Sequence, residues 1–251
     1  MRSVAGFEGS PRAVRLALWR AVEAQHVIST MVLVDTQAEQ ELLESLLEQA
    51  KPPIPAPAGR LHYLLFTPFR YPPTGYGSRF RRPGDAGVFY GADEVRTACA
   101  EVGYWRWRFL LDADLERIDP RPQTVFQVAI RGPAIDLRQA PWVARRKRWT
   151  DPVNYDACQT LAAEARSRGV AVIRYESVRD PAHGGAAAVL APAAFARRAP
   201  TAVETWYLAV DRHRVRWYRE GVRHAAAGFE FEAALWAATG GPASSSPLPP
   251  S

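Results

Sequence analysis

The side chains best suited to chemistry lie in residues 70–104, where an arginine-dense loop broken by glycines precedes a short apolar strand and a helix. Arg79 stands in the loop between Gly77 and Gly84, and Arg70 stands before the loop. Guanidinium groups beside flexible backbone suit phosphate oxygens, because the planar fork donates paired hydrogen bonds and keeps its charge. The pattern predicts a site for a phosphorylated molecule, although an ordinary basic surface loop fits the same residue types.

Three further side chains are candidates for the same cleft: Glu101, Tyr90 and Ser177. Successive helical residues turn by about 100°, which places Glu101 on the shoulder of an apolar stripe, where its carboxylate can face a cationic reaction centre. Tyr90 ends the short strand and Ser177 follows a later one, so both can contact a ligand at a strand end. A solvated helix glutamate, a core tyrosine and a turn serine are the ordinary alternatives.

Motifs of other chemistries are missing from the sequence. It contains no GxSxG elbow, phosphate-binding GxxxxGK loop, GxGxxG turn or HExxH helix. The five histidines show no metal-ligand spacing with Cys99 and Cys158, so no metal site is predicted. A Ser–His–acid relay stays open, but nothing in the sequence points to one.

Composition favours a globular protein: 47% of the 251 residues are hydrophobic and 23% are charged. No apolar run reaches the length of about 18 residues that a membrane-spanning helix needs. The first 20 residues lack the apolar stretch of an export signal, and both cysteines stand in helical patterns, as in a reduced compartment. We therefore expect a cytoplasmic protein without a membrane partner.

The formal charge of +6 comes almost entirely from arginine, since Lys51 and Lys147 are the only lysines. Arg145, Arg146 and Arg148 form the densest basic cluster. A cluster of this kind can contact nucleic-acid phosphates, meet an acidic protein or be solvated. Solvation or a protein partner is the favoured interpretation.

Hydrophobic patterning predicts an α+β fold, in which many short strands are separated by isolated helices. The expected helices cover residues 11–27, 37–50, 93–107 and 154–168, with Asp35 and Asp93 as N-caps of the second and third. The expected strands cover residues 61–66, 88–90, 124–130, 170–175, 187–190, 206–210 and 214–218. We divide the chain into an N-terminal helical extension with a Pro-rich linker (1–58), a main domain (59–239) and a disordered tail (240–251).

Four blocks of the sequence resemble the signature segments of the RES-domain family, at residues 76–80, 87–94, 98–101 and 175–181. The blocks read YGSRF, GVFYGADE, ACAE and YESVRDP, and they occur in the family's order with sensible spacing. The arginine, glutamate and serine that name the family fall on Arg79, Glu101 and Ser177. The family's tyrosine falls on Tyr90, and its strand-end arginine falls on Arg70.

This resemblance implies a fold similar to that of ADP-ribosyltransferase toxins, with a mixed β-sheet core, surrounding helices and, here, two N-terminal helices. It also implies the toxin of a bacterial toxin–antitoxin module. Such a toxin cleaves the nicotinamide–ribose bond of NAD+ as its substrate, without a metal, depletes NAD+ and arrests growth. The implied partner is a helix-turn-helix antitoxin that covers the active site and itself binds DNA. A homodimer within that complex stays open.

The sequence departs from the family pattern in two places. Phe80-Arg81 stands where the family has an aromatic residue followed by asparagine, and residues 183–186, HGGA, lack the usual asparagine after the serine. The resemblance assigns Glu101 to the cationic transition state, Arg79 and Arg70 to the pyrophosphate, Tyr90 to the nicotinamide side and Ser177 to substrate positioning. Three alternatives stay open: transfer of ADP-ribose to a protein, an inactive family member, and a non-enzymatic basic module that binds nucleic acid or protein.

Overall fold

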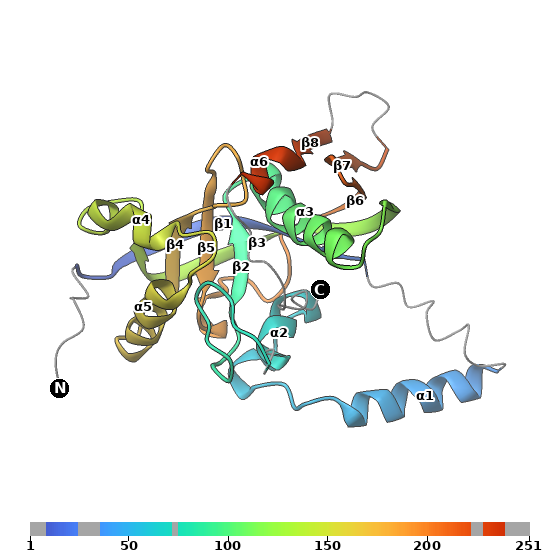
Figure 1. The fold of residues 1–251 in the computed structure, drawn as a ribbon. Helices are drawn as coiled ribbons and strands as arrows, with labels where there is room; N and C mark the ends of the chain where they lie inside the picture. Colours follow the sequence, from blue (N-terminus) through green and yellow to red (C-terminus); the bar gives the residue numbers. More distant parts are fainter. Residues whose placement is uncertain (1–8, 25–35, 72–74, 222–227, 239–251) are drawn as a thin grey trace.

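In the computed structural model, the described residues are 9–24, 36–71, 75–221 and 228–238 (Figure 1). The strands are β1 (Arg12–Glu23), β2 (Phe89–Ala92), β3 (Arg117–Asp136), β4 (Val172–Glu176), β5 (Gly185–Val189), β6 (Ala202–Asp211), β7 (Arg214–Arg219) and β8 (Gly228–Glu232). The α-helices are α1 (Gln37–Ala50), α2 (Tyr63–Arg70), α3 (Val95–Asp112), α4 (Arg146–Trp149), α5 (Asp156–Ser167) and α6 (Ala233–Ala237). Short 3-10 helices cover Ala56–Ala58 (η2), Trp142–Arg145 (η3) and Pro192–Ala194 (η4).

One mixed sheet holds all the named strands, in the order β1-β2-β5-β4-β3-β6-β7-β8. Strand β1 also pairs with β3, so β1, β2, β5, β4 and β3 close into a ring, while β6, β7 and β8 extend from the long strand β3. Only the β3–β4 pairing is parallel; the other pairings are antiparallel. The expectation of a mixed sheet with surrounding helices is confirmed.

The first expected helix, over residues 11–27, is wrong where the structure describes it. Residues 12–23 form β1, which lies antiparallel to β3 along its whole length, from Arg12 opposite Ala134 to Glu23 opposite Gln123. The apolar residues of this segment fit the period of a helix as well as that of a strand, and pairing with β3 decided between the two. Val14, Leu16 and Leu18 alternate along β1 and join the core at the centre of the ring.

The expected strand over residues 61–66 is also wrong, because helix α2 covers most of it. The His62 ring caps the helix by accepting a hydrogen bond at Nδ1 from the Leu64 N–H at 3.3 Å. Leu65 and Phe69, one turn apart, both bury their side chains. Six apolar residues in a row predict burial, but they do not fix the period of the backbone.

The remaining expected elements are present, the helix over residues 37–50 with the predicted ends and the others with shifted ends. The helix over residues 37–50 is α1, the strand over 88–90 is β2, and the helix over 154–168 is α5. The hairpin of residues 206–218 is β6 and β7. Residues 240–251, where a disordered tail was expected, and the expected N-cap Asp35 lie outside the described residues.

Asp93 does not cap α3 as expected; Glu94 holds the N-cap position, without a side-chain capping bond. Asp93 instead accepts hydrogen bonds at Oδ2 from Arg174 at 2.7 Å and from Arg138 at 3.2 Å. Arg138 also donates from Nη2 to Asp136 at 2.8 Å. We call Asp93, Asp136, Arg138 and Arg174 the ion cluster; it ties the ends of β2, β3 and β4 together.

Burial acts to raise the pKa of Asp136, but hydrogen bonds from Arg138 and the charges of Arg138 and Arg174 hold that pKa below its ordinary value. Gly185 leaves the room that this arrangement needs. A Cβ atom at Gly185 would lie 2.1 Å from Asp93 Oδ2 and 2.3 Å from Arg138 Nη1. The ion cluster therefore requires a residue without a side chain at position 185.

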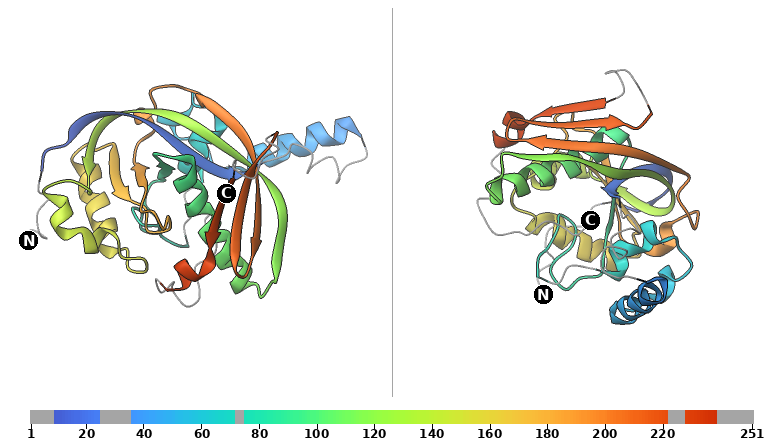
Figure 2. Two further views of the ribbon diagram at one scale, coloured as in Figure 1. Left: turned by 90° about the horizontal axis from the view of Figure 1, so that it is seen from above. Right: turned by 90° about the vertical axis from the view of Figure 1, so that its right-hand side faces the viewer.

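Helix α3 packs across β1, β6 and β7 and meets α6, so that Tyr104, Trp107, Trp217 and Trp236 share one apolar core. Figures 1 and 2 show α4 and α5 beside β4, at the opposite end of the molecule from β7 and β8, and α1 standing out from the body. No helix in the described part of the chain is long and apolar enough to cross a membrane. Three of the four leucines of α1, Leu42, Leu46 and Leu47, are exposed.

Candidate functional site

Ser177 and Glu101 meet directly, as the sequence predicted for a common cleft. Ser177 follows the last residue of β4, and Glu101 lies in the second turn of α3. The Ser177 hydroxyl donates a hydrogen bond from Oγ to Glu101 Oε1 at 2.6 Å. Ser177 is fully buried, while Glu101 is partly exposed, so the carboxylate keeps a route to a ligand.

The backbone after β4 fixes the direction of the Ser177 hydroxyl. Its oxygen accepts hydrogen bonds from the N–H groups of Arg179 at 3.2 Å and Asp180 at 3.0 Å. A hydroxyl has one proton to donate and two lone pairs to accept with. Since backbone donors occupy the acceptor positions, the proton is directed to Glu101.

Asp180 fastens this turn to the start of α3. Its Oδ2 accepts a hydrogen bond from Thr97 Oγ1 at 2.7 Å, and its Oδ1 forms an ion pair with Arg96. Gly184 is required beside this contact, because a Cβ atom there would lie 2.1 Å from Thr97 Oγ1 and 2.8 Å from Asp180 Oδ2. The residue pairs Thr97–Asp180 and Glu101–Ser177 therefore join one helix to one turn at two successive points.

Arg79 reaches the same region from the glycine-broken loop. Its Nη1 donates to the carbonyl oxygen of Trp149 at 2.9 Å, and its guanidinium lies 4.5 Å from the centre of the Tyr155 ring. Burial acts to lower the pKa of Arg79, but the neighbouring groups, in decreasing order Tyr155, Cys158, Tyr175 and Glu101, raise it above its ordinary value. Arg79 therefore stays charged, within electrostatic reach of the Glu101 carboxylate.

Tyr90 holds the arginine loop instead of standing free at the strand end. Its hydroxyl lies 2.8 Å from Ser78 Oγ and accepts a hydrogen bond from the Phe80 N–H at 3.0 Å. Burial raises the pKa of Tyr90, and the hydrogen bond with Ser78 and the charges of Arg81 and Arg79 oppose that rise. The structure thus brings Tyr90 beside Arg79 and uses its hydroxyl to shape the loop.

The pair at which the sequence departs from the family pattern, Phe80-Arg81, has structural partners. Phe80 is fully buried, with its ring centre 4.9 Å from that of Tyr175. Arg81 donates from Nη2 to the Tyr76 carbonyl at 2.6 Å and closes the loop on itself. Gln159 of α5 donates to the carbonyls of Ser78 and Arg81 and holds the loop from the other side.

Arg70 is placed differently from the other candidates. It ends helix α2, where its Nε donates to the Pro52 carbonyl at 2.7 Å. Its guanidinium lies 5.4 Å from the ring centre of Tyr71 and 6.0 Å from that of Phe66. These contacts belong to α2 and to the linker after α1, whereas Arg79, Glu101 and Ser177 share one neighbourhood.

Sequence reasoning missed two residues of this neighbourhood, Tyr155 and Arg179. Tyr155 precedes α5 and stacks on Arg79; Arg179 is 2% exposed, and its guanidinium lies 3.8 Å from the Tyr104 ring centre. The segment YESVRDP carried a signal for Arg179, because a charged residue follows a buried strand within a quoted block. No local pattern marked Tyr155.

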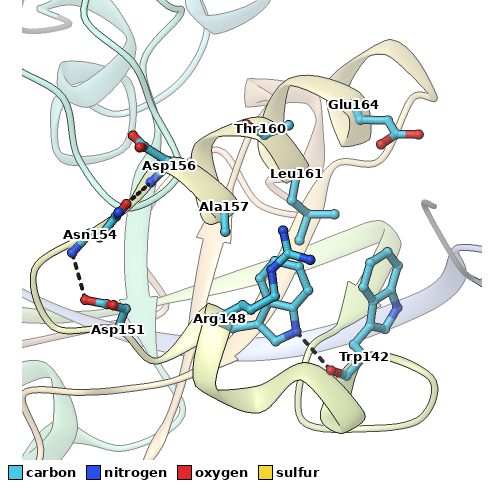
Figure 3. A pocket seen from close by; sticks show the side chains of 10 residues that line it. Trp142, Arg148, Asp151, Asn154, Asp156, Ala157, Thr160, Leu161 and Glu164 are labelled. Atoms are coloured by element: carbon cyan, nitrogen blue, oxygen red, sulfur yellow. Dashed lines mark hydrogen bonds between the residues drawn. The ribbon is translucent and has the colours of Figure 1, made fainter. Parts of the chain in front are cut away.

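A pocket of about 380 Å³ lies beside this neighbourhood, between α4 and α5 (Figure 3). Its walls include Trp142, Trp149, Leu161 and the loop residues Asp151 and Asn154. The pocket contains none of Arg79, Glu101 and Ser177, although the Trp149 carbonyl binds Arg79. We take the hydrogen-bonded side chains, rather than the pocket, as the candidate site, because the chemistry resides in them.

Neither the basic cluster near α4 nor a metal-binding group contributes to the candidate site. Arg146 donates from Nε to Glu176 at 2.7 Å and so is engaged within the chain. Within residues 9–24, 36–71, 75–221 and 228–238, no three histidine, cysteine, aspartate or glutamate side chains could hold a metal ion.

The site therefore combines an oriented, partly exposed carboxylate with a charged guanidinium that forms no ion pair among the described residues. Arg79 is 7% exposed, and no carboxylate in contact neutralises its charge, so the guanidinium keeps its attraction for an anion. A carboxylate held by a buried hydroxyl can stabilise positive charge that develops on a bound molecule. The arrangement suits a reaction in which a phosphorylated substrate forms a cationic centre.

Comparisons with known proteins give two results. The sequence model of the family described as RES domain matches residues 54–211. The crystal structure of the M. tuberculosis MbcT–MbcA toxin–antitoxin complex is similar, with a TM-score of 0.44 and 14% sequence identity, over 80% of this chain and 86% of that chain. No curated protein matches the sequence.

Proposed function

The chain belongs to the RES domain family, and from this membership and the geometry of the site we propose that it is a toxin that consumes NAD+. The reaction is cleavage of the bond between nicotinamide and ribose, with NAD+ as substrate and no metal. Loss of NAD+ then arrests growth of a bacterial cell. Glu101, Arg79 and Ser177 are the residues proposed to carry this activity.

The observation that supports the proposal most strongly is the hydrogen bond from Ser177 to Glu101 within reach of the Arg79 charge. Cleavage of an N-glycosidic bond builds an oxocarbenium-like centre on the ribose, as glycoside cleavage does generally. Glu101 stabilises this cation, since its carboxylate is oriented before the reaction starts. Nicotinamide leaves as a neutral base, so the site needs no strong general acid.

The other groups act on binding and orientation. Arg79 holds the pyrophosphate, because its charge is held in place by the Trp149 carbonyl and the Tyr155 ring. Ser177 keeps Glu101 in position, and Tyr90 supports the loop that carries Arg79. In hydrolysis, water adds to the ribose carbon, nicotinamide departs and one proton is released; in phosphorolysis, phosphate takes the place of water.

A small helix-turn-helix antitoxin is the proposed partner. This antitoxin would cover the site, and it, rather than the toxin, would bind DNA. The pairing of Arg146 with Glu176 is consistent with this division, because the charge of that arginine is balanced within the chain.

Incubation of NAD+ with the purified chain tests the proposal. Liquid chromatography and mass spectrometry should show free nicotinamide together with ADP-ribose, or ADP-ribose phosphate when phosphate is added. Radiolabelled NAD+ incubated with added protein extract separates degradation from transfer, because transfer leaves the label on protein. If NAD+ stays intact under all these conditions, the proposed function is wrong.

A further inference from the structure

Arg179 contacts Ser177, helix α3 and the loop before α5. It lies in the turn after β4, two residues beyond Ser177, and is 2% exposed. Within the described part of the chain it forms no ion pair, and its Nη1 atom is buried without a hydrogen-bond partner. A buried unpaired donor destabilises a fold, so a residue of this kind calls for an explanation other than stability.

The side chain of Arg179 reaches the loop before α5. Its Nη2 donates to the Pro152 carbonyl at 2.7 Å and to the Tyr155 hydroxyl at 3.1 Å. Its guanidinium also lies over the ring of Tyr104, which stands one helical turn after Glu101. One side chain therefore spans the distance between α3 and the loop of residues 150–155.

The main chain of Arg179 acts on Ser177 directly. Its N–H donates to Ser177 Oγ at 3.2 Å, and its carbonyl accepts a hydrogen bond from Trp236 Nε1 at 2.6 Å. Anchoring the side chain therefore also anchors an N–H group that orients the serine.

Tyr155 continues the connection to the phosphate side of the site. Its hydroxyl is bonded to Arg179, while its ring lies 4.5 Å from the Arg79 guanidinium. Asn154 and Asp151 of the same loop face the pocket in Figure 3, where their side chains accept backbone hydrogen bonds. The loop is thus braced from within, and Arg179 fixes its position relative to α3.

We propose that Arg179 and Tyr155 form a positioning pair, which couples the orientation of Ser177 and Glu101 to the position of Arg79. The pair acts through these residues and does not touch the reacting atoms. The expected change in kcat rests on the proposed function, whereas the expected coupling between the two segments in hydrogen–deuterium exchange does not. It assigns a role in the site to two residues that the sequence analysis did not name.

The kinetic test is a double-mutant cycle on NAD+ consumption with Arg179→Lys and Tyr155→Phe. Arg179→Lys keeps the positive charge but loses the forked guanidinium group. Tyr155→Phe keeps the ring over Arg79 but loses the hydroxyl group. Each should lower kcat about 10-fold, with KM changed less than threefold, because small displacements at a reacting centre act on kcat. Together they should cost about 10-fold rather than 100-fold, because both break the same hydrogen bond.

Arg166→Lys and Tyr207→Phe are the matched controls. Arg166 donates to the carbonyls of Leu190 at 2.8 Å and Ala86 at 3.1 Å, and the exposed hydroxyl of Tyr207 lies 3.1 Å from Glu220. Both controls should leave kcat unchanged within twofold. Losses that multiply in the double variant, or equal losses in the controls, would overturn the positioning pair.

Hydrogen–deuterium exchange tests the coupling without any substrate. Arg179→Lys should raise exchange in residues 150–156 and in residues 177–183 together, whereas Arg166→Lys should raise neither. Exchange that rises in one segment alone would overturn the coupling. If the wild-type chain consumes no NAD+ but both segments respond together, the proposed function fails and the positioning pair stands.

Discussion

Two arginine-rich regions of this molecule differ in how their charges are matched. In the ion cluster, Arg138 and Arg174 are each in contact with Asp93 and Asp136. At the candidate site, Arg79 and Arg179 instead contact carbonyl oxygens and aromatic rings. The side chains of the ion cluster are partly exposed, whereas Arg79 and Arg179 are buried.

The difference separates a structural role from a binding role. Guanidinium groups whose charge is neutralised by carboxylates hold strands together and have little affinity left for a ligand. Guanidinium groups held by neutral partners keep their direction and their charge, and they can attract phosphate oxygens. The comparison predicts that substitutions in the two regions have opposite effects on turnover and on stability.

Removal of the Arg79 side chain should give the largest effect on turnover among the substitutions that contrast the two arginine-rich regions. Arg79→Ala should lower kcat/KM for NAD+ by about 10²–10³-fold, the usual cost of losing one preorganised charge. Arg138→Ala is the matched substitution in the ion cluster, and it should lower the midpoint of thermal unfolding while the folded fraction keeps its turnover. Steady-state kinetics and thermal denaturation should be measured for both variants. Equal losses of turnover in Arg79→Ala and Arg138→Ala would contradict the distinction between the two regions.

Ser177→Ala should have the next largest effect. Without the hydroxyl, Glu101 loses the donor that orients it, and kcat should fall about 10- to 100-fold. The N–H groups of Arg179 and Asp180 lose their acceptor, which should also lower the free energy of unfolding by about 1–2 kcal/mol. Kinetics at a temperature well below the unfolding midpoint separates the two losses. Unchanged kcat would mean that the serine is only a turn residue.

Asp136→Asn should change stability and leave turnover within about twofold. Neighbouring arginines hold the pKa of Asp136 below its ordinary value of 3.8, so the carboxylate contributes stability above that value. This contribution is lost as the pH falls through the lowered pKa, because the folded protein must then take up the proton. The variant should be about 1–2 kcal/mol less stable at pH 7, and the gap should close in urea titrations below about pH 4.

Arg70→Lys should give the smallest effect of the series. Arg70 contacts the Pro52 carbonyl and two rings of its own helix region, so the variant should change kcat/KM for NAD+ less than threefold. The family resemblance assigned Arg70 to the pyrophosphate, and this variant tests that assignment. A loss as large as that of Arg79→Ala would place Arg70 in the site after all.

The sequence placed Ser177 and Glu101 near each other, but it did not predict the backbone of two earlier segments. Ser177 and Glu101 were expected to share a cleft because each stood at an element end or on a helix shoulder, and they are hydrogen bonded. Helix α1 and the β6–β7 hairpin were likewise expected, since long periodic or alternating segments specify their own structure. In these cases the local pattern and the tertiary contacts agree.

The predictions for the segments that form β1 and α2 were wrong for the same reason. The apolar residues of each segment fit either backbone period, so long-range contacts decide: pairing with β3 for β1, and packing of Leu65 and Phe69 for α2. Arg179 and Tyr155 were missed because their importance lies in contacts between distant segments. Asp93 was misread as a cap because the arginines that bind it are far away in sequence.

The central claim is that the carboxylate of Glu101 acts on a bound dinucleotide, and one comparison tests it directly. NAD+ consumption should be measured for the wild-type chain, for Glu101→Gln and for Glu94→Gln, a matched change at the exposed start of the same helix. The account predicts normal turnover in Glu94→Gln and a loss of about 10²–10³-fold in Glu101→Gln, with an unchanged fold. Wild-type turnover in Glu101→Gln would contradict it.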